Sequence, residues 1–169
     1  FASDGKLIAN GLSIRDAWSA DIIRFLEWKS SMSDPYGVSI SPGGKLFAAG
    51  QVGSKSSDIM ILDAETAMEI QTLSGHANPV WDVAFSLDGR FLASASGKYS
   101  DFANGGPGEA KLWDLSTGKA NQTHETRLCL YSISISGDGR RFAASGGAYH
   151  GGYKRPDRGE IKVWDVQTG

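Results

Sequence analysis

Few residues of this 169-residue chain have the type and spacing that catalysis needs. Its three histidines, His76, His124 and His150, are far apart in the sequence and lack the spacing of metal ligands. Ser116 and Lys119 form a Ser-x-x-Lys pattern, which some acyl-transfer enzymes use, but they fall on a glycine-containing turn. The chain has no Gly-x-Ser-x-Gly motif and no phosphate-binding loop. We therefore expect no catalytic site, no metal site, no cofactor and no enzyme activity.

Composition indicates a globular protein without a strong charge field. The 17 basic and 19 acidic side chains give a net charge of −2, so neither nucleic acid nor an anionic membrane is an expected partner. The longest aliphatic run, 59–62, is too short to cross a bilayer, and no cationic-then-apolar leader opens the chain. These features favour a cytoplasmic location. Cys129, the single cysteine, lies beside an alternating apolar segment and is interpreted as a small buried residue.

Glycine is unusually common, at 22 of 169 residues, whereas proline occurs only 5 times. With many Val, Ile, Phe and Trp residues, this composition is typical of short strands joined by tight turns. Four similar turn segments recur along the chain: Asp4-Gly5-Lys6, Gly43-Gly44-Lys45, Asp88-Gly89-Arg90 and Asp138-Gly139-Arg140. They are 39, 45 and 50 residues apart (43 − 4, 88 − 43 and 138 − 88), which indicates an internal repeat.

Each repeat contains apolar segments with the alternation of β-strands. Before three of the turns, alternate positions are apolar in 38–40, 83–85 and 133–135, and a small-apolar strand follows each turn. A third strand is expected in four segments: 23–27, 59–63, 110–114 and 161–165. A fourth follows, as in 69–73. No segment shows sustained helical periodicity, so the sequence predicts an all-β fold with four strands per repeat.

The repeat resembles the WD-repeat family, because several motifs stand in phase with the turns. They are Gly75-His76, Val80-Trp81-Asp82-Val83, Leu92-Ala93-Ser94, Lys111-Leu112-Trp113-Asp114 and Trp164-Asp165. The resemblance implies a β-propeller, made of four-stranded antiparallel blades around a central channel. About four blades are expected within 1–169, with limits near 1–33, 34–74, 75–124 and 125–169. The first and last blades are expected to be incomplete.

The repeats are degenerate, since Leu26-Glu27 and Leu62-Asp63 replace Trp-Asp in the first two. The resemblance also implies a buried hydrogen-bond network that joins a histidine, a strand serine and the tryptophan to an aspartate in a neighbouring loop. His76, Ser94 and Trp113 match three of its members, and we expect them to be structural. No aspartate stands at the expected place before Trp113.

The chain is expected to be part of a larger propeller, because the family typically closes with more blades than four. Four partial blades would leave exposed strand edges that invite association. The implied partners are therefore further blades of the same chain, or a second copy through self-association of the open arc. A small four-bladed ring remains an alternative.

Two groups of residues are candidates for contact with a protein or peptide partner. Tyr36, Trp81 and Tyr131 occupy one equivalent position near the start of the inner strand, which the resemblance places at the channel mouth. Packing between blades is the alternative role. The segments 11–20, 97–109 and 146–160 are interpreted as loops between second and third strands, on the same face. Their candidate contact residues are Trp18, Tyr99, Phe102, Tyr149, Tyr153 and Arg155.

These features predict a protein–protein interaction scaffold that recognises a partner without chemistry. The alternative is a regulatory or sensory propeller module fused to an enzyme or electron-transfer domain outside this segment. That alternative rests on the insertions that contain 106–109 and 158–160, which resemble those of bacterial members of the family.

Overall fold

The computed structural model describes residues 6–10, 13–25, 35–51, 57–98, 106–148 and 158–169. All regular structure in these residues is β, arranged as four antiparallel sheets of three, four, four and three strands. Sheet 1 contains β1 (Leu7–Asn10), β2 (Ser13–Asp16) and β3 (Ile22–Phe25), and sheet 2 contains β4 (Val38–Ile40), β5 (Leu46–Gly50), β6 (Ile59–Asp63) and β7 (Glu69–Leu73). Sheet 3 contains β8 (Val80–Phe85), β9 (Phe91–Gly97), β10 (Gly108–Asp114) and β11 (Lys119–Thr126), and sheet 4 contains β12 (Leu130–Ile135), β13 (Arg141–Ala148) and β14 (Arg158–Asp165). The described residues contain no helix that could span a membrane.

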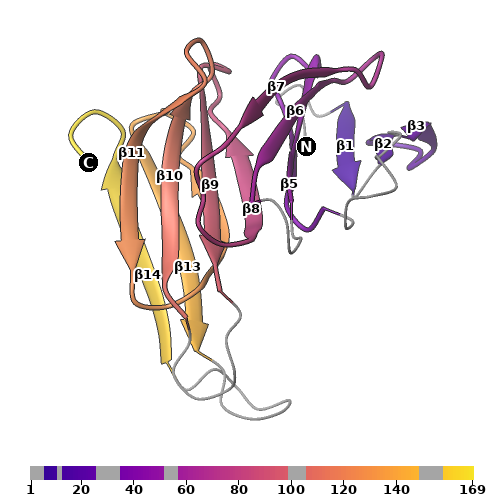
Figure 1. Cartoon of the computed structure of the whole chain (residues 1–169). Coiled ribbons are helices and arrows are strands. Elements are labelled where there is room, and N and C mark those ends of the chain that lie inside the picture. The colour runs from indigo at the N-terminus through magenta and orange to yellow at the C-terminus, as the bar shows by residue number, and fades with distance from the viewer. Residues whose placement is uncertain (1–5, 11–12, 26–34, 52–56, 99–105, 149–157) are drawn as a thin grey trace.

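The sheets follow one another in chain order, from sheet 1 at one side of the molecule to sheet 4 at the other (Figure 1). Within each sheet the strands are also in chain order, so every connection is a hairpin. The prediction of an all-β chain with repeated four-stranded units and two incomplete ones is confirmed.

The glycine turns form the first hairpin of sheets 2, 3 and 4. Gly44, Gly89 and Gly139 adopt φ of 68°, 69° and 69°, a left-handed conformation that glycine adopts without a steric penalty. The amide of Gly89 donates to the Ser86 carbonyl oxygen at 2.9 Å, and Ser86 Oγ accepts from Phe91 N at 2.9 Å. We call the end of the sheets that carries these hairpins the turn end, and the opposite end, at Gly50, Gly97 and Gly147, the loop end.

Each third strand ends in an aspartate that caps the next turn. Asp63 Oδ1 accepts from the amides of residues 65 and 66 at 3.0 and 2.7 Å, and Asp165 Oδ1 accepts from those of residues 167 and 168 at 2.8 and 3.0 Å. These hydrogen bonds hold the pKa of both carboxyls below the usual range. The aspartate of the Trp-Asp motif is therefore a turn cap at the turn end.

Sheet 1 corrects the alignment of the first repeat, in which 23–27 is expected to be a third strand. Ala17 N donates to the Lys6 carbonyl oxygen at 2.9 Å. The equivalent hydrogen bond in sheet 3, just after its third strand, runs from Leu115 N to the Arg90 carbonyl oxygen at 3.0 Å. β2 is therefore the third strand of sheet 1, and β3 is the fourth. Asp16 is its turn cap, accepting from the amides of residues 18 and 19 at 2.9 Å each. The equivalence is concealed in the sequence because Arg15 stands where the motif has tryptophan.

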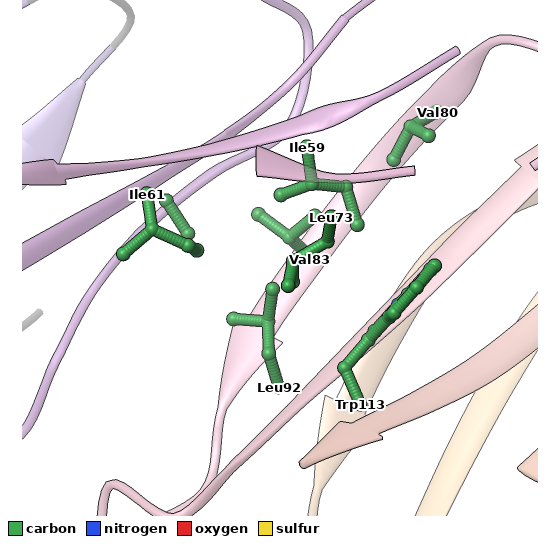
Figure 2. Packing of buried hydrophobic residues seen from close by; sticks show 8 residues of the cluster. Ile59, Ile61, Leu73, Val80, Val83, Leu92 and Trp113 are labelled. Carbon is green, nitrogen blue, oxygen red and sulfur yellow. The ribbon is translucent and has the colours of Figure 1, made fainter. Parts of the chain in front are cut away.

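The core lies between successive sheets. Between sheets 2 and 3, the buried side chains of Ile59, Ile61 and Leu73 face Val80, Val83, Leu92 and Trp113 (Figure 2). Similar clusters lie between sheets 1 and 2 and between sheets 3 and 4. In the second and third strands of sheets 2 and 3, alternate residues face the preceding and the following sheet, which explains why β5, β6, β9 and β10 are buried on both faces.

Candidate partner-binding site

Three aromatic rings from three successive sheets lie together at the loop end. The ring centroids of Tyr36 and Trp81 are 5.2 Å apart at 75°, and those of Trp81 and Tyr131 are 6.0 Å apart at 63°. Both contacts have the edge-to-face geometry that aromatic pairs prefer. We call these residues the aromatic arc. The structure thus brings together the three residues that the turn alignment singles out.

Exposure differs along the arc. Tyr36 is 66% exposed, whereas Trp81 and Tyr131 are half-buried. Trp81 Nε1 donates to the carbonyl oxygen of Gly97 at 2.8 Å. This bond satisfies the polar group of the indole, so the remaining surface of the ring is available for apolar contact.

Close backbone approach positions Tyr36. A Cβ on the next residue, Gly37, would overlap the backbone of Asp82 in β8, with the Trp81 carbonyl oxygen at 2.7 Å. The start of the second repeat can therefore lie directly against β8 only because residue 37 is glycine. The same approach sets the Tyr36 ring against the Trp81 ring.

Asp82 holds the neighbouring sheets in register. Its Oδ2 accepts from Ile133 N at 2.9 Å and from Ser132 Oγ at 3.0 Å, and its Oδ1 accepts from Val83 N at 2.9 Å. Burial raises the pKa of Asp82, while these hydrogen bonds act in the opposite direction. The carboxylate next to the arc thus binds β12 of the following sheet.

Cys129 lies beneath the arc and is fully buried. Burial raises the pKa of its thiol, and the side chains of Tyr131 and Trp81 oppose that shift. A thiol with a raised pKa is poorly nucleophilic. This agrees with its interpretation as a small buried residue.

Of the remaining candidate residues, Trp18 alone lies in the part of the chain that the structure describes. Trp18 is 91% exposed, but it lies in the β2–β3 turn at the turn end, so its placement among the arc-side loops is wrong. The sequence places it there only because the third strand of sheet 1 is misaligned. Five further candidates lie outside the described residues: Tyr99, Phe102, Tyr149, Tyr153 and Arg155.

The hydrogen-bond network of sheet 3 contains an acidic member that the sequence analysis did not assign. His76 Nε2 lies 2.6 Å from Ser94 Oγ, and Trp113 Nε1 donates to Ser94 Oγ at 2.8 Å. His76 Nδ1 lies 2.9 Å from Glu109 Oε2. Glu109 therefore takes the acidic position, at the start of β10, where the family pattern has aspartate in a loop.

The donors and acceptors of this network place one proton of the histidine. The Glu109 carboxylate only accepts, so His76 Nδ1–H donates to it, and Ser94 Oγ accepts from Trp113, which only donates. A neutral His76 accepts the Ser94 proton at Nε2. Burial lowers the pKa of His76, although Glu109 acts to raise it. The hydrogen bond from His76 in turn lowers the pKa of Glu109.

Sheet 4 lacks this network and is held by ring packing. Ala144 stands in place of the serine, as the sequence indicates. Trp164 stacks on Phe142 at 5.2 Å and on His124, which reaches it from β11, at 4.8 Å. His124 is therefore a packing residue between sheets 3 and 4. Among the described residues, no group of three His, Cys, Asp or Glu side chains could hold a metal ion.

Comparison with known proteins identifies the repeat. Residues 68–114 match the family described as WD domain, G-beta repeat. The chain is 54% identical over 57 residues to WD repeat-containing protein SL1-17 of Schistosoma mansoni, covering 34% of this chain and 17% of that protein. It is 33% identical over 101 residues to eukaryotic translation initiation factor 3 subunit I of Brugia malayi, covering 60% of this chain and 27% of that protein. The chain thus spans less than a third of the length of either relative.

The fold has a counterpart among solved structures. The β-propeller domain of Cps50 (Swd1) from Myceliophteria thermophila superposes with a TM-score of 0.57 at 23% identity, covering 76% of this chain and 38% of that one. The hairpin-connected antiparallel sheets described above are accordingly blades of a propeller. Residues 68–114 thus match one WD repeat, and the chain as a whole has the β-propeller fold and resembles WD-repeat proteins.

Proposed function

We propose that the chain is an interaction scaffold that binds a protein or peptide through the aromatic arc of Tyr36, Trp81 and Tyr131. The observation that carries the proposal is the edge-to-face row of three rings across three sheets, partly open to solvent. The resemblance of the chain to WD-repeat proteins, which generally act as non-enzymatic scaffolds, supports the same function.

The arc has the physical properties of a binding anchor. Tyrosine and tryptophan present a large contact area with few rotatable bonds, so little conformational entropy is lost on binding. Here the Trp81–Gly97 hydrogen bond and the two ring contacts already fix the central side chain. The site is therefore preorganised, and the cost of ordering it on binding is small.

A catalytic function finds no support in the described residues. Burial makes the Cys129 thiol unreactive, and Asp82 and His76 are engaged in hydrogen bonds that stabilise the blades. The arc offers apolar ring surface. We therefore infer recognition of a partner segment that presents apolar or aromatic side chains.

A peptide-library selection tests the proposed function. Peptides displayed on phage would be selected on the full chain, and their affinities would be measured for wild type, Trp81→Ala and Trp18→Ala. The two substitutions remove the same side chain from opposite ends of the sheets. We expect Trp81→Ala to weaken binding by roughly 30-fold, equivalent to about 2 kcal/mol, and Trp18→Ala to leave it unchanged. Equal affinity of wild type and Trp81→Ala for every selected peptide would refute the proposal.

A further inference from the structure

The outer strands of the first two sheets carry exposed apolar side chains near the turn end. Trp18, in the β2–β3 turn, is 91% exposed, and Ile23 of β3 is 55% exposed. Met68, just before β7, and Ile70 of β7 are 68% and 55% exposed. We call these four residues the apolar rim. Apolar side chains gathered on one part of a surface mark an interaction site, whereas single ones do not.

Sheets 1 and 2 bring the two parts of the apolar rim together. Ala64 and Ala67 of the β6–β7 turn pack in the same core cluster as Leu7 and Ile14 of sheet 1. The β6–β7 turn thus lies on the side of sheet 2 that faces sheet 1 (Figure 1). Ile14 pairs with Arg24 of β3, so the rim continues from β3 onto this turn.

The fold does not require apolar residues at these positions. Trp18 corresponds to Ser116 of sheet 3, because the amide of each donates at 2.9 Å to the capping aspartate two residues earlier. Ile23 and Ile70 correspond to Asn121, since each lies seven residues after its capping aspartate (23 − 16, 70 − 63 and 121 − 114). Ser116 and Asn121 are exposed, although sheet 3 packs between sheets 2 and 4. Exposure is therefore a property of the outer position, and polar residues suffice there.

Hydrogen bonds hold the backbone that carries Trp18. Asp16 Oδ1 accepts from the Trp18 amide at 2.9 Å, and the Asp16 carbonyl oxygen accepts from Ala20 N at 3.0 Å. Arg15 Nη1 donates to the Ala20 carbonyl oxygen at 2.9 Å. The indole ring is thus open to solvent on a turn that is already ordered. Such a ring provides contact area at a small entropic cost when a partner binds.

Acidic side chains surround the apolar rim. The segments 16–25 and 63–73 contain five acidic residues and one basic residue, a formal charge of −4, whereas the whole chain carries −2. Asp21, Glu65 and Glu69 are exposed. This negative charge attracts a basic partner and repels an anionic membrane surface.

We propose that the apolar rim is a second interaction surface, which binds a basic protein segment whose apolar side chains pack on Trp18 and Met68. Charge complementarity selects the class of partner, and the exposed tryptophan is its anchor. The inference does not depend on the proposed function of the aromatic arc, because Trp18 and Trp81 lie at opposite ends of the sheets.

An NMR titration with two designed peptides tests the proposal. The probe is an amphipathic peptide of leucine and lysine, and the control has glutamate in place of every lysine. We expect the Leu–Lys peptide to shift the indole N–H signal of Trp18 and the methyl signal of Met68. The signals of Trp113 and Met60, which are buried, should stay in place. The Leu–Glu peptide should shift none of the four.

Substitutions with matched controls measure the anchor and the charge separately. Trp18→Ala should weaken binding of the Leu–Lys peptide by about tenfold, while the melting temperature stays unchanged because the side chain is exposed. Gln167→Ala, at the corresponding position of the turn after β14, should leave the affinity unchanged. Glu65→Lys should weaken binding by about threefold, and Glu125→Lys, at the loop end of β11, should have a smaller effect.

Four results would overturn the inference. One is an unshifted Trp18 signal at saturating Leu–Lys peptide, and another is equal binding of the two peptides. The third is loss of Leu–Lys binding in Trp81→Ala but not in Trp18→Ala, which would assign the peptide to the aromatic arc. The fourth is a dimer of the chain that Trp18→Ala converts to a monomer, because a second copy would then occupy the rim.

Discussion

Glu109→Ala should destabilise the third blade more than is usual for a side chain that is partly exposed to solvent. Glu109 Oε2 accepts the Nδ1 proton of His76 at 2.9 Å, and the His76 side chain is fully buried. Removing the carboxylate leaves a buried N–H without its acceptor. A hydrogen bond to a charged group contributes about 1.5–3 kcal/mol, so we expect the free energy of unfolding to fall by that amount. For a chain of this length, the melting temperature should fall by about 3–12 °C.

Chemical denaturation and thermal melts followed by circular dichroism measure this loss. Glu125 lies directly across the β10–β11 ladder from Glu109 and is exposed, so Glu125→Ala is the matched control and should change stability by less than about 0.5 kcal/mol. Glu109→Gln keeps an acceptor for the histidine proton and should lose less than Glu109→Ala. Equal stability of Glu109→Ala and Glu125→Ala would refute the assignment of Glu109 to the network.

Three further predictions concern the packing of the blades. Burial lowers the pKa of His76 below its usual value of 6.5, so the unfolded chain binds a proton at a higher pH than the folded protein does. The free energy of unfolding should therefore fall as the pH drops below 6.5. The difference between the melting temperatures at about pH 7.5 and about pH 5.5 should be smaller in His76→Gln than in wild type. Asp82→Ala should cost about 1–3 kcal/mol in denaturant titrations, because it removes the acceptor that joins β8 to β12, and Asp82→Asn should cost less. Gly97→Ala should cost about 1–3 kcal/mol because its Cβ overlaps Cys129, whereas Gly43→Ala, with nothing within 4 Å, should be nearly neutral in the same titration.

Local signals explain how much of the fold could be predicted from the sequence. Gly89 and Gly139 require a left-handed turn, and the apolar alternation on either side specifies the strands that the turn joins. Both signals depend on neighbouring residues alone, so they survive in degenerate repeats. The third strand of the first repeat was assigned to the wrong residues, because Arg15 stands at the tryptophan position. Its turn cap, Asp16, therefore has no distinctive neighbour in the sequence.

The site depends on contacts between distant residues, which the sequence does not display. The alignment of turns placed Tyr36, Trp81 and Tyr131 at one register position, but the ring contacts arise from the spacing of successive blades. Glu109 was not assigned to the network because the family pattern has an aspartate before Trp113, and only the contact with His76 shows that a glutamate takes that role. No local pattern indicates that the Asp82 side chain reaches Ile133 in the next blade, 51 residues away.

The most direct test of the scaffold model compares Trp81→Ala with Trp113→Ala in both peptide binding and thermal stability. Trp113 is 2% exposed within the core, so its removal should cost about 3–5 kcal/mol while the folded fraction still binds the selected peptide normally. Trp81 is half-buried with one hydrogen bond, so Trp81→Ala should cost only about 1 kcal/mol and weaken binding by roughly 30-fold. Loss of stability without loss of affinity in Trp81→Ala would contradict the model and make the aromatic arc part of the packing between blades.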